Sequence, residues 1–211
     1  MNKKIVNFHI DTQENINFIF ENNLSSRSII IEGKKGLGKK DLITYLSGKL
    51  LLNSEKIYKN IHPDFLIIDA GDEKILVDDI SVLDDWIYMP PFESINKIVF
   101  INNSHNMTEV VQNKILKILE EPPSYLIFFL SVENSNILLP TVISRSLVLS
   151  LNKLPNQIVS DTLDIEVNDE DRKLIIDSMD GSLRNIDKFD NIIIPMPVSY
   201  THLTLPTNRE V

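Results

Sequence analysis

The sequence predicts an α/β protein in three layers, in which a parallel sheet is covered by helices on both faces. Short, continuously apolar segments recur along the chain, and they alternate with segments that have apolar residues at helical spacing. Strands buried on both faces are apolar throughout, and parallel strands are joined by crossovers that are usually helices. A length of 211 residues suits one such domain with a smaller attachment.

The first unit of this pattern surrounds a glycine-rich turn. Residues 28–32 (SIIIE) form an apolar run that predicts a buried strand. The turn GKKGLGKK follows at 33–40, and the amphipathic segment DLITYLSGKLLL follows at 41–52. A strand, a glycine-rich loop and a helix in this order are typical of a phosphate-binding unit.

The second unit joins another apolar run to a short helical pattern. Residues 64–69 (DFLIID) predict a strand. Ile80, Leu83 and Ile87 then share helical spacing. A Pro-Pro dipeptide ends this helix, because proline has no amide donor for the helical ladder.

The third unit has the clearest periodicity. Residues 97–101 (KIVFI) predict a buried strand, and residues 106–121 predict a helix that ends at a second Pro-Pro dipeptide. Asn106 and Glu109 stand three residues apart, which is the spacing of a capping box. The apolar positions of this helix are Val111, Ile115, Ile118 and Leu119.

Two further apolar runs, 125–132 (YLIFFLSV) and 146–151 (SLVLSL), predict the last strands of the sheet. After Pro155 the strand pattern ends, and the acidic segment 164–189 predicts small helices interrupted at Gly181. We interpret this part as a small helical lid.

We therefore expect a P-loop-type domain at residues 1–154, an incomplete lid domain at 155–197 and a non-native tail at 198–211. The tail, VSYTHLTLPTNREV, loses the acidic, Ile/Asn/Lys-rich composition of the rest and has no periodicity. It resembles the conceptual translation of a sequencing-library adapter, which predicts that the gene fragment ended near Pro197. The alternative interpretation is a disordered native tail.

Composition narrows the classes of function. The formal net charge of −9 disfavours sequence-independent nucleic-acid binding as the main activity. The absence of cysteine excludes disulfides and cysteine-ligated zinc. No apolar run approaches the roughly 20 residues of a membrane-spanning helix, and the N-terminus lacks the pattern of a secretory signal. We therefore expect a cytoplasmic protein without a membrane role. The dense basic cluster of the chain consists of Lys34, Lys35, Lys39 and Lys40.

The basic cluster lies within an incomplete P-loop. Gly33, Gly38 and Lys39 have the P-loop spacing, in which glycines let backbone N–H groups approach phosphate and the lysine meets the phosphate charge. Gly36 lies between them. The next position should offer a Ser or Thr hydroxyl to magnesium, but Lys40 is a cation and cannot ligate a metal. A purely structural glycine turn is the alternative interpretation.

The second half of the expected magnesium site is also altered. After the strand KIVFI, an ATPase should place an acidic pair that holds hydrated magnesium and polarises the attacking water. Asn102 and Asn103 occupy these positions. A carboxamide is neutral and is no base, so it can neither balance the charge of the metal nor accept the proton. Asparagines at a strand end can also be ordinary turn residues.

The order of the motifs resembles a known family. HPDFLIID, ILVDDI and the long run from KIVFINN through LKILEEPP to LLPTVISRS are similar to the delta-prime and gamma/tau subunits of the bacterial DNA polymerase III clamp loader. The resemblance covers residues 28–155, and it implies a three-layer AAA+ (RecA-like) domain. Ser144 and Arg145 match the Ser-Arg-Cys motif of the family, whereas Ser146 departs from it.

The resemblance implies specific roles for single residues. Arg145 would be an arginine finger that reaches the γ-phosphate bound by an adjacent subunit, although an idle surface arginine is the alternative. Ser131, at the end of the YLIFFL strand, would be the sensor 1 residue, and Arg184 in the segment Gly-Ser-Leu-Arg would be sensor 2. A buried strand-end hydroxyl and a common helix-start turn are the respective alternatives.

Within the family, the altered magnesium site favours a delta-prime-type subunit over the gamma/tau motor. We expect a subunit that does not hydrolyse ATP itself, that requires neither magnesium nor zinc, and that binds ATP or ADP weakly without metal. Its partners would be gamma/tau and delta, and through the complex the sliding clamp and primed DNA in the replisome at the nucleoid. The family has a C-terminal collar domain that we expect to be missing here. The alternatives are a self-sufficient AAA+ ATPase and an AAA+ scaffold with an idle Arg145.

Overall fold

The predicted parallel sheet is confirmed by the computed structural model, which describes residues 3–21, 27–163 and 169–183. All four pairings in the sheet are parallel, and the strand order is β2-β3-β4-β1-β5. Because β1 lies between β4 and the edge strand β5, the glycine-rich turn leaves the sheet one strand in from that edge. The strands are β1 (Ser28–Glu32), β2 (Phe65–Ile68), β3 (Lys97–Ile101), β4 (Leu126–Val132) and β5 (Leu147–Ser150).

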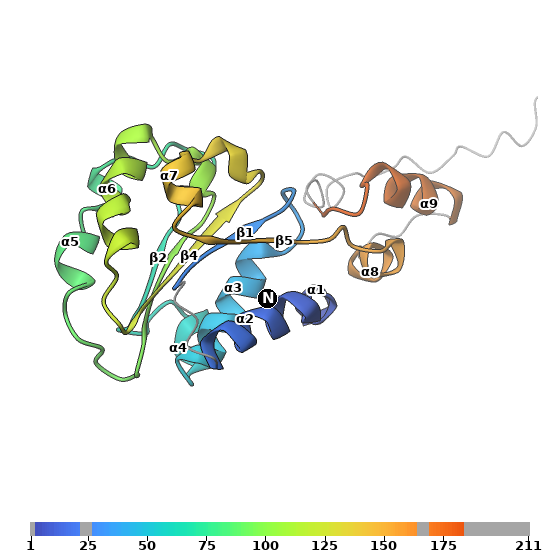
Figure 1. The fold of residues 1–211 in the computed structure, drawn as a ribbon. Coiled ribbons are helices and arrows are strands. Elements are labelled where there is room, and N and C mark those ends of the chain that lie inside the picture. The colour runs from blue at the N-terminus through green and yellow to red at the C-terminus, as the bar shows by residue number, and fades with distance from the viewer. Residues whose placement is uncertain (1–2, 22–26, 164–168, 184–211) are drawn as a thin grey trace, which may run out of the picture.

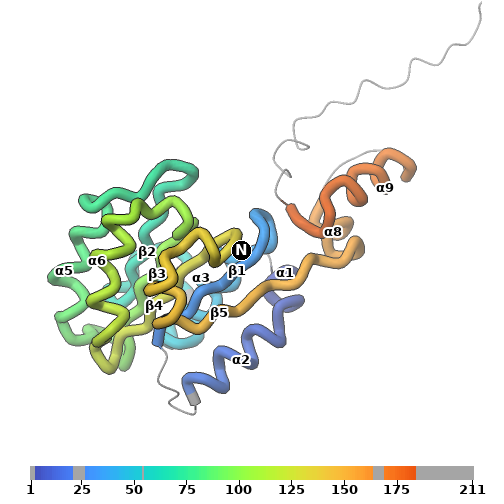
Figure 2. Tube along the Cα trace, turned by 45° about the horizontal axis from the view of Figure 1, so that its top comes forward, coloured from blue at the N-terminus to red at the C-terminus, as the bar shows by residue number. Residues whose placement is uncertain are grey.

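Helices cover both faces of the sheet, and two further helices continue beyond β5 (Figure 1). One face carries α1 (Lys3–Phe8), α2 (Ile10–Glu21), α3 (Lys39–Leu50) and α4 (Ser54–Tyr58). The other carries α5 (Leu83–Trp86), α6 (Glu109–Glu120), α7 (Pro140–Ile143) and the 3-10 turn η1 (Asp78–Ile80). The 3-10 turns η2 (Ser104–Asn106) and η3 (Ser135–Ile137) follow β3 and β4. The pair beyond β5 consists of α8 (Asn156–Thr162) and α9 (Asp169–Ser178) (Figure 2).

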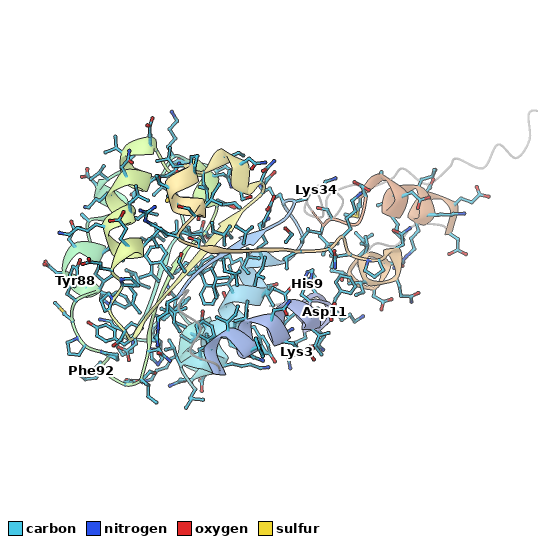
Figure 3. The ribbon with its side chains drawn as sticks, viewed as in Figure 1. Lys3, His9, Asp11, Lys34, Tyr88 and Phe92 are labelled. Atoms are coloured by element: carbon cyan, nitrogen blue, oxygen red, sulfur yellow. The ribbon has the colours of Figure 1, made fainter. Side chains whose placement is uncertain are left out.

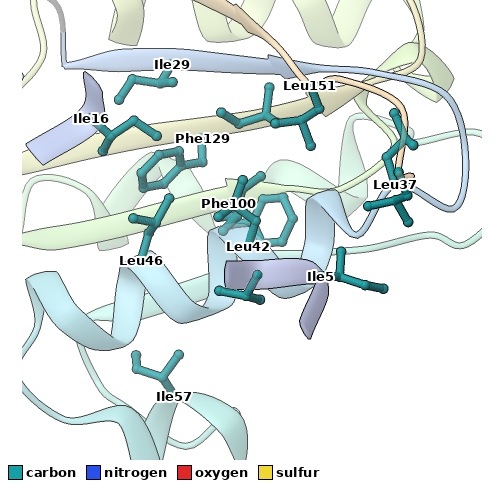
Figure 4. Packing of buried hydrophobic residues seen from close by; sticks show 14 of the residues in the cluster. Ile5, Ile16, Ile29, Leu37, Leu42, Leu46, Ile57, Phe100, Phe129 and Leu151 are labelled. Atoms are coloured by element: carbon teal, nitrogen blue, oxygen red, sulfur yellow. The ribbon is translucent and has the colours of Figure 1, made fainter. Parts of the chain in front are cut away.

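The core is divided by the sheet into two apolar clusters. Neighbouring residues of one strand point to opposite faces, so Ile29 and Ile31 join one cluster and Ile30 joins the other. On the first face, Phe100 and Phe129 pack toward Leu42 and other residues of α3 (Figure 4). The central strands are apolar throughout because both of their faces are buried.

Because all strands run in the same direction, their carboxyl ends lie together at one border of the sheet and their amino ends at the other. We call these two borders the carboxyl edge and the amino edge. The glycine-rich loop leaves the carboxyl end of β1, whereas Ser28 and Ser146 meet at its amino end through their hydroxyls, 2.8 Å apart. Lys34 of the loop and His9 lie toward the α8–α9 side of the molecule, while Tyr88 and Phe92 lie at the far end (Figure 3). A residue at one edge therefore cannot act at the other within the same chain.

The structure corrects the predicted cap of α6 and adds helices that the sequence did not predict. The N-cap of α6 is Thr108, whose hydroxyl accepts a hydrogen bond from Val111 N, so the predicted capping box of Asn106 and Glu109 is wrong. Asn106 belongs instead to η2. Helices α1, α2, α4 and α7 were not predicted.

Several expectations concern residues outside the described ranges. The tail at 198–211 lies wholly outside them, as does part of the lid segment at 155–197. Across the described part of the chain, no helix has the length and apolar content needed to cross a bilayer.

Candidate functional site

The glycine-rich loop has the backbone geometry that its sequence predicts. Gly36 and Gly38 have φ values of 89° and 80°, in the left-handed region that favours glycine. Gly38 caps the N-terminus of α3. A Cβ atom added at Gly38 would lie 2.4 Å from Ile5 Cγ2, because α1 packs directly against the loop. The loop is therefore held from outside by an N-terminal helix.

Lys39 turns back onto the loop that carries it. Its ammonium donates hydrogen bonds to the carbonyl oxygens of Gly33 and Lys34, the latter at 2.9 Å. The residue is 7% exposed, and this burial lowers the pKa of Lys39 to about 8, although the charge of Glu133 opposes the shift. The lysine expected to meet phosphate thus bonds to the protein's own carbonyls.

Lys40 forms an ion pair at the position where magnesium chemistry was expected. Its Nζ lies 2.7 Å from Oδ2 of Asp69, which directly follows β2. Burial raises the pKa of Asp69, but hydrogen bonds from Lys40, the Gly71 amide and Asn102 outweigh it and lower the pKa below its usual value. The ammonium thus supplies the positive charge that this carboxylate faces.

Asn102 and Asn103 belong to the same hydrogen-bond network. The buried Ser131 hydroxyl donates a hydrogen bond to Asn102 Oδ1 at 2.7 Å. It accepts a hydrogen bond from the backbone N–H of Asn103 at 3.0 Å. Asn103 adopts a left-handed conformation and donates through Nδ2 to the carbonyl of Gly71. The network connects the carboxyl ends of β2, β3 and β4.

These donor groups do not fit magnesium. Mg²⁺ requires oxygen ligands in near-octahedral geometry and usually takes one or two carboxylates from the protein. Lys40 offers no lone pair, and the amide oxygen of Asn102 already accepts the Ser131 hydroxyl. Asp69 is the one carboxylate of this network, and its charge is matched by Lys40. The local chemistry therefore supports an ion pair in place of a metal.

The remaining loop lysines also have carboxylate partners. Lys34 Nζ lies 2.8 Å from Asp180 Oδ2, and Lys35 Nζ lies 2.7 Å from Asp72 Oδ1. Asp180 also pairs with Lys153, and bonds from these two lysines lower the pKa of Asp180 to about 2. All four lysines of the predicted phosphate cradle are thus engaged within the chain.

The backbone of the loop is bonded from two sides. The segment after α9 contributes Leu183 N, which donates to Gly36 O at 3.1 Å, and the hydroxyl of Ser182, which donates to Lys35 O. From the opposite side, His9 Nε2 donates to Leu37 O at 2.9 Å. Burial lowers the pKa of His9, while this hydrogen bond opposes the shift.

Arg145 lies at the amino edge of the sheet, away from this loop. It follows α7 and precedes β5, and its Nη2 pairs with Glu120 Oε1 at 2.8 Å. Its Nη1 donates to Thr141 O at 3.1 Å. Because β1 separates the two edges by five residues, or roughly 16 Å of strand, Arg145 cannot reach its own glycine-rich loop.

The structure therefore sorts the predicted residues into two groups. One group gathers at the carboxyl edge: Gly33, Gly36, Gly38, Lys39, Lys40, Asn102, Asn103 and Ser131. Arg145 stands apart at the other edge, and Arg184 lies outside the described residues.

Sequence reasoning missed the partners of the loop lysines, chiefly Asp69 and Asp180, and the partner of Arg145, Glu120. Asp69 carried a usable signal, because an acidic residue directly after a parallel strand lies at the same edge as the loop.

Comparisons with known proteins agree with the motif resemblance. A family model described as "DNA polymerase III, delta subunit" matches residues 9–155. The delta' subunit of DNA polymerase III from Buchnera aphidicola subsp. Schizaphis graminum is 32% identical over 142 residues, which are 61% of this chain and 40% of that protein. The gamma subunit from the same organism is 27% identical over 202 residues, which are 86% of this chain and 55% of that protein.

A solved structure extends the likeness to the fold. The DNA polymerase III gamma subunit-related protein of Thermotoga maritima superposes with a TM-score of 0.62 at 25% identity, covering 83% of this chain and 56% of that one. The AAA+ (RecA-like) fold implied by the motifs is confirmed. The chain spans about half the length of the curated relatives it matches.

Proposed function

This chain belongs to the DNA polymerase III, delta subunit family, and we propose from that membership that it acts as a delta-prime-type clamp-loader subunit that hydrolyses no ATP itself. It supplies Arg145 to the nucleotide site of a neighbouring subunit. Its partners are gamma/tau and delta, and through the assembled complex it serves the loading of the sliding clamp on primed DNA.

One observation carries the proposal for its own nucleotide site. The Lys40 ammonium and the Asp69 carboxylate lie 2.7 Å apart where magnesium and its ligands would be needed. A nucleotide without magnesium lacks the charge that stabilises phosphoryl transfer. ATP or ADP therefore binds weakly, without metal, and is not hydrolysed.

The position of Arg145 supports action in trans. Its side chain is 35% exposed, so it is accessible to a partner. Exposed ion pairs such as that with Glu120 are typically worth about 0.2–1 kcal/mol, so exchange of Glu120 for a phosphate costs little. A guanidinium presented to the γ-phosphate of a neighbour stabilises the charge that develops in the transition state.

The proposal divides into domains as the sequence suggested. We assign residues 1–154 to the AAA+ unit and residues 155–197 to the lid, whose described part, up to residue 183, adjoins the glycine-rich loop. Hydrogen bonds from Ser182 and Leu183 to the loop support this division of roles.

Two measurements test the proposal. The complete protein, purified alone, should show no magnesium-dependent ATP turnover, and measurable turnover would instead support a self-sufficient ATPase. In the clamp-loader complex reconstituted from complete subunits, Arg145→Ala should lower ATP turnover at the adjoining site by roughly 10³-fold or more. Unchanged DNA-stimulated turnover with normal assembly would support an idle scaffold and overturn the proposal.

A further inference from the structure

A second arginine lies beside Arg145 at the amino edge of the sheet. Arg27 directly precedes β1, and its carbonyl accepts a hydrogen bond from Phe128 N at 2.8 Å. The next residue, Ser28, meets the Ser146 hydroxyl at 2.8 Å. The backbone at Arg27 is therefore bonded to β4, and the serine contact joins the two segments that carry the arginines.

Both arginines line one small pocket. Its volume is about 90 Å³, and its apolar walls include Ile118, Leu126 and Phe128. This volume equals roughly three water molecules at 30 Å³ each, which leaves room for a phosphate-sized group. A cation beside apolar walls interacts more strongly with an anion than a fully solvated cation does.

The two arginines differ in their partners. Arg145 is paired with Glu120, whereas the side chain of the half-buried residue Arg27 has neither a hydrogen bond nor an ion pair with any residue that the structure describes. Glu120 balances one of the two charges, so the pocket keeps a net charge of +1. This surplus is notable in a chain whose formal net charge is −9.

We propose that Arg27 is a second phosphate-contacting arginine of the in-trans site, placed to bind the same terminal phosphate of the neighbour's nucleotide as Arg145. The inference rests on the proposed function, because it assigns Arg27 to the surface from which Arg145 acts. Glu120 holds Arg145 until the partner's phosphate replaces it. The uncompensated charge of Arg27 attracts that phosphate before the exchange occurs.

The test uses the clamp-loader complex reconstituted from complete subunits, with ATP as the ligand. Arg27→Ala should lower kcat for DNA-stimulated ATP turnover about tenfold, the effect of removing one hydrogen bond to a charged group. Arg27→Lys should recover part of that loss, because it restores the charge without the planar fork. Lys117→Ala removes a charge from the exposed face of α6, outside the pocket, and should leave kcat unchanged.

The outcomes separate the inference from the proposed function. If Arg145→Ala is impaired while Arg27→Ala matches Lys117→Ala, Arg27 has no role and the inference fails alone. If Arg145→Ala is itself unimpaired, the proposed function fails. Should Arg27→Ala prevent assembly, Arg27→Gln keeps the length of the side chain without its charge. An assembled Gln variant with control activity would overturn the inference, and one with the tenfold loss would support it.

Discussion

The two edges of the sheet have opposite arrangements of charge. At the carboxyl edge, Lys34, Lys35 and Lys40 pair with carboxylates of the same chain, and Lys39 bonds to loop carbonyls. At the amino edge, two arginines share a pocket with one carboxylate, Glu120. The lysines of the carboxyl edge all bond within the chain, whereas one arginine of the amino edge has no partner among the residues that the structure describes.

On the proposed function, this difference explains how an AAA+ domain without its own magnesium chemistry can still act at the nucleotide site of a neighbouring subunit. At the carboxyl edge, Lys40 supplies a positive charge to Asp69, and the Ser131 hydroxyl donates a hydrogen bond to the side-chain amide oxygen of Asn102. Buried polar groups need such partners to avoid the cost of desolvation. The amino edge needs no similar replacement, since its arginines are partly exposed to solvent.

The largest expected effect tests how tightly Ile5 packs against Gly38 of the glycine-rich loop. Gly38→Ala should destabilise the protein by about 2 to 5 kcal/mol, because the left-handed conformation costs about 1–2 and overpacking against Ile5 adds about 1–3. Gly71→Ala is the matched control, since Gly71 has φ 65° but no atom within 4 Å of an added Cβ. Denaturant unfolding of both variants measures the difference, and equal losses would show that Ile5 moves aside.

The second prediction uses the titration of Lys39. Burial lowers its folded pKa to about 8, below the 10.5 of the free side chain, so the unfolded chain binds more protons between these values. Unfolding free energy should therefore rise with pH through this window, by an amount on the order of 2 kcal/mol. Lys39→Met should lack this rise, as denaturant midpoints at pH 8, 9 and 10 would show. Parallel pH profiles for the two proteins would contradict the buried charge.

A third prediction compares one serine at each edge. Ser131→Ala should lower the free energy of unfolding by about 1–3 kcal/mol, because the side-chain oxygen of Asn102 and the backbone N–H of Asn103 lose their buried partner. Ser146→Ala, at the amino edge, should cost about 0.5–1.5 kcal/mol, since Ser146 is only partly buried. Thermal and denaturant unfolding measure both variants. A larger loss for Ser146→Ala would reverse the comparison between the edges.

The sequence predicted the sheet well because its strands are local features. The runs at 28–32 and 97–101 have the bounds of β1 and β3, since continuous apolar character marks strands buried on both faces. The α6 periodicity was also predicted, but its cap was not. Asn106 had the right spacing, yet Thr108 has the extended conformation from which a hydroxyl reaches the helix amides.

The candidate site could be predicted only in part, because its closure depends on long-range pairs. Glycine spacing predicted the loop, and Lys40 together with the two asparagines predicted a site without magnesium ligands. The contacts of that loop with Ile5, His9, Asp69 and Asp180 join segments far apart in the sequence, and periodicity carries no information about such pairs. The separation of Arg145 from the loop follows from the parallel direction of β1 and β5, because Arg145 precedes β5 and the loop follows β1.

The smallest expected effect concerns the exposed ion pair between Asp180, which follows α9, and Lys34 of the glycine-rich loop. Asp180→Asn removes the carboxylate shared by Lys34 and Lys153, while asparagine tolerates the left-handed backbone at this position. The freed Lys34 charge should then be available to an anion at the loop. Binding of inorganic pyrophosphate without magnesium should strengthen about two- to fivefold at low salt, the size expected of one exposed ion pair.

Calorimetric titration at two ionic strengths measures this change, because an effect of exposed charge shrinks as salt screens it. Glu170→Gln removes one negative charge from α9 without touching a loop lysine, so it controls for the change in net charge. If both variants bind pyrophosphate equally well, the Asp180 carboxylate does not weaken anion binding at the loop. Weak anion binding would then depend on the Lys40 ion pair and the buried network alone.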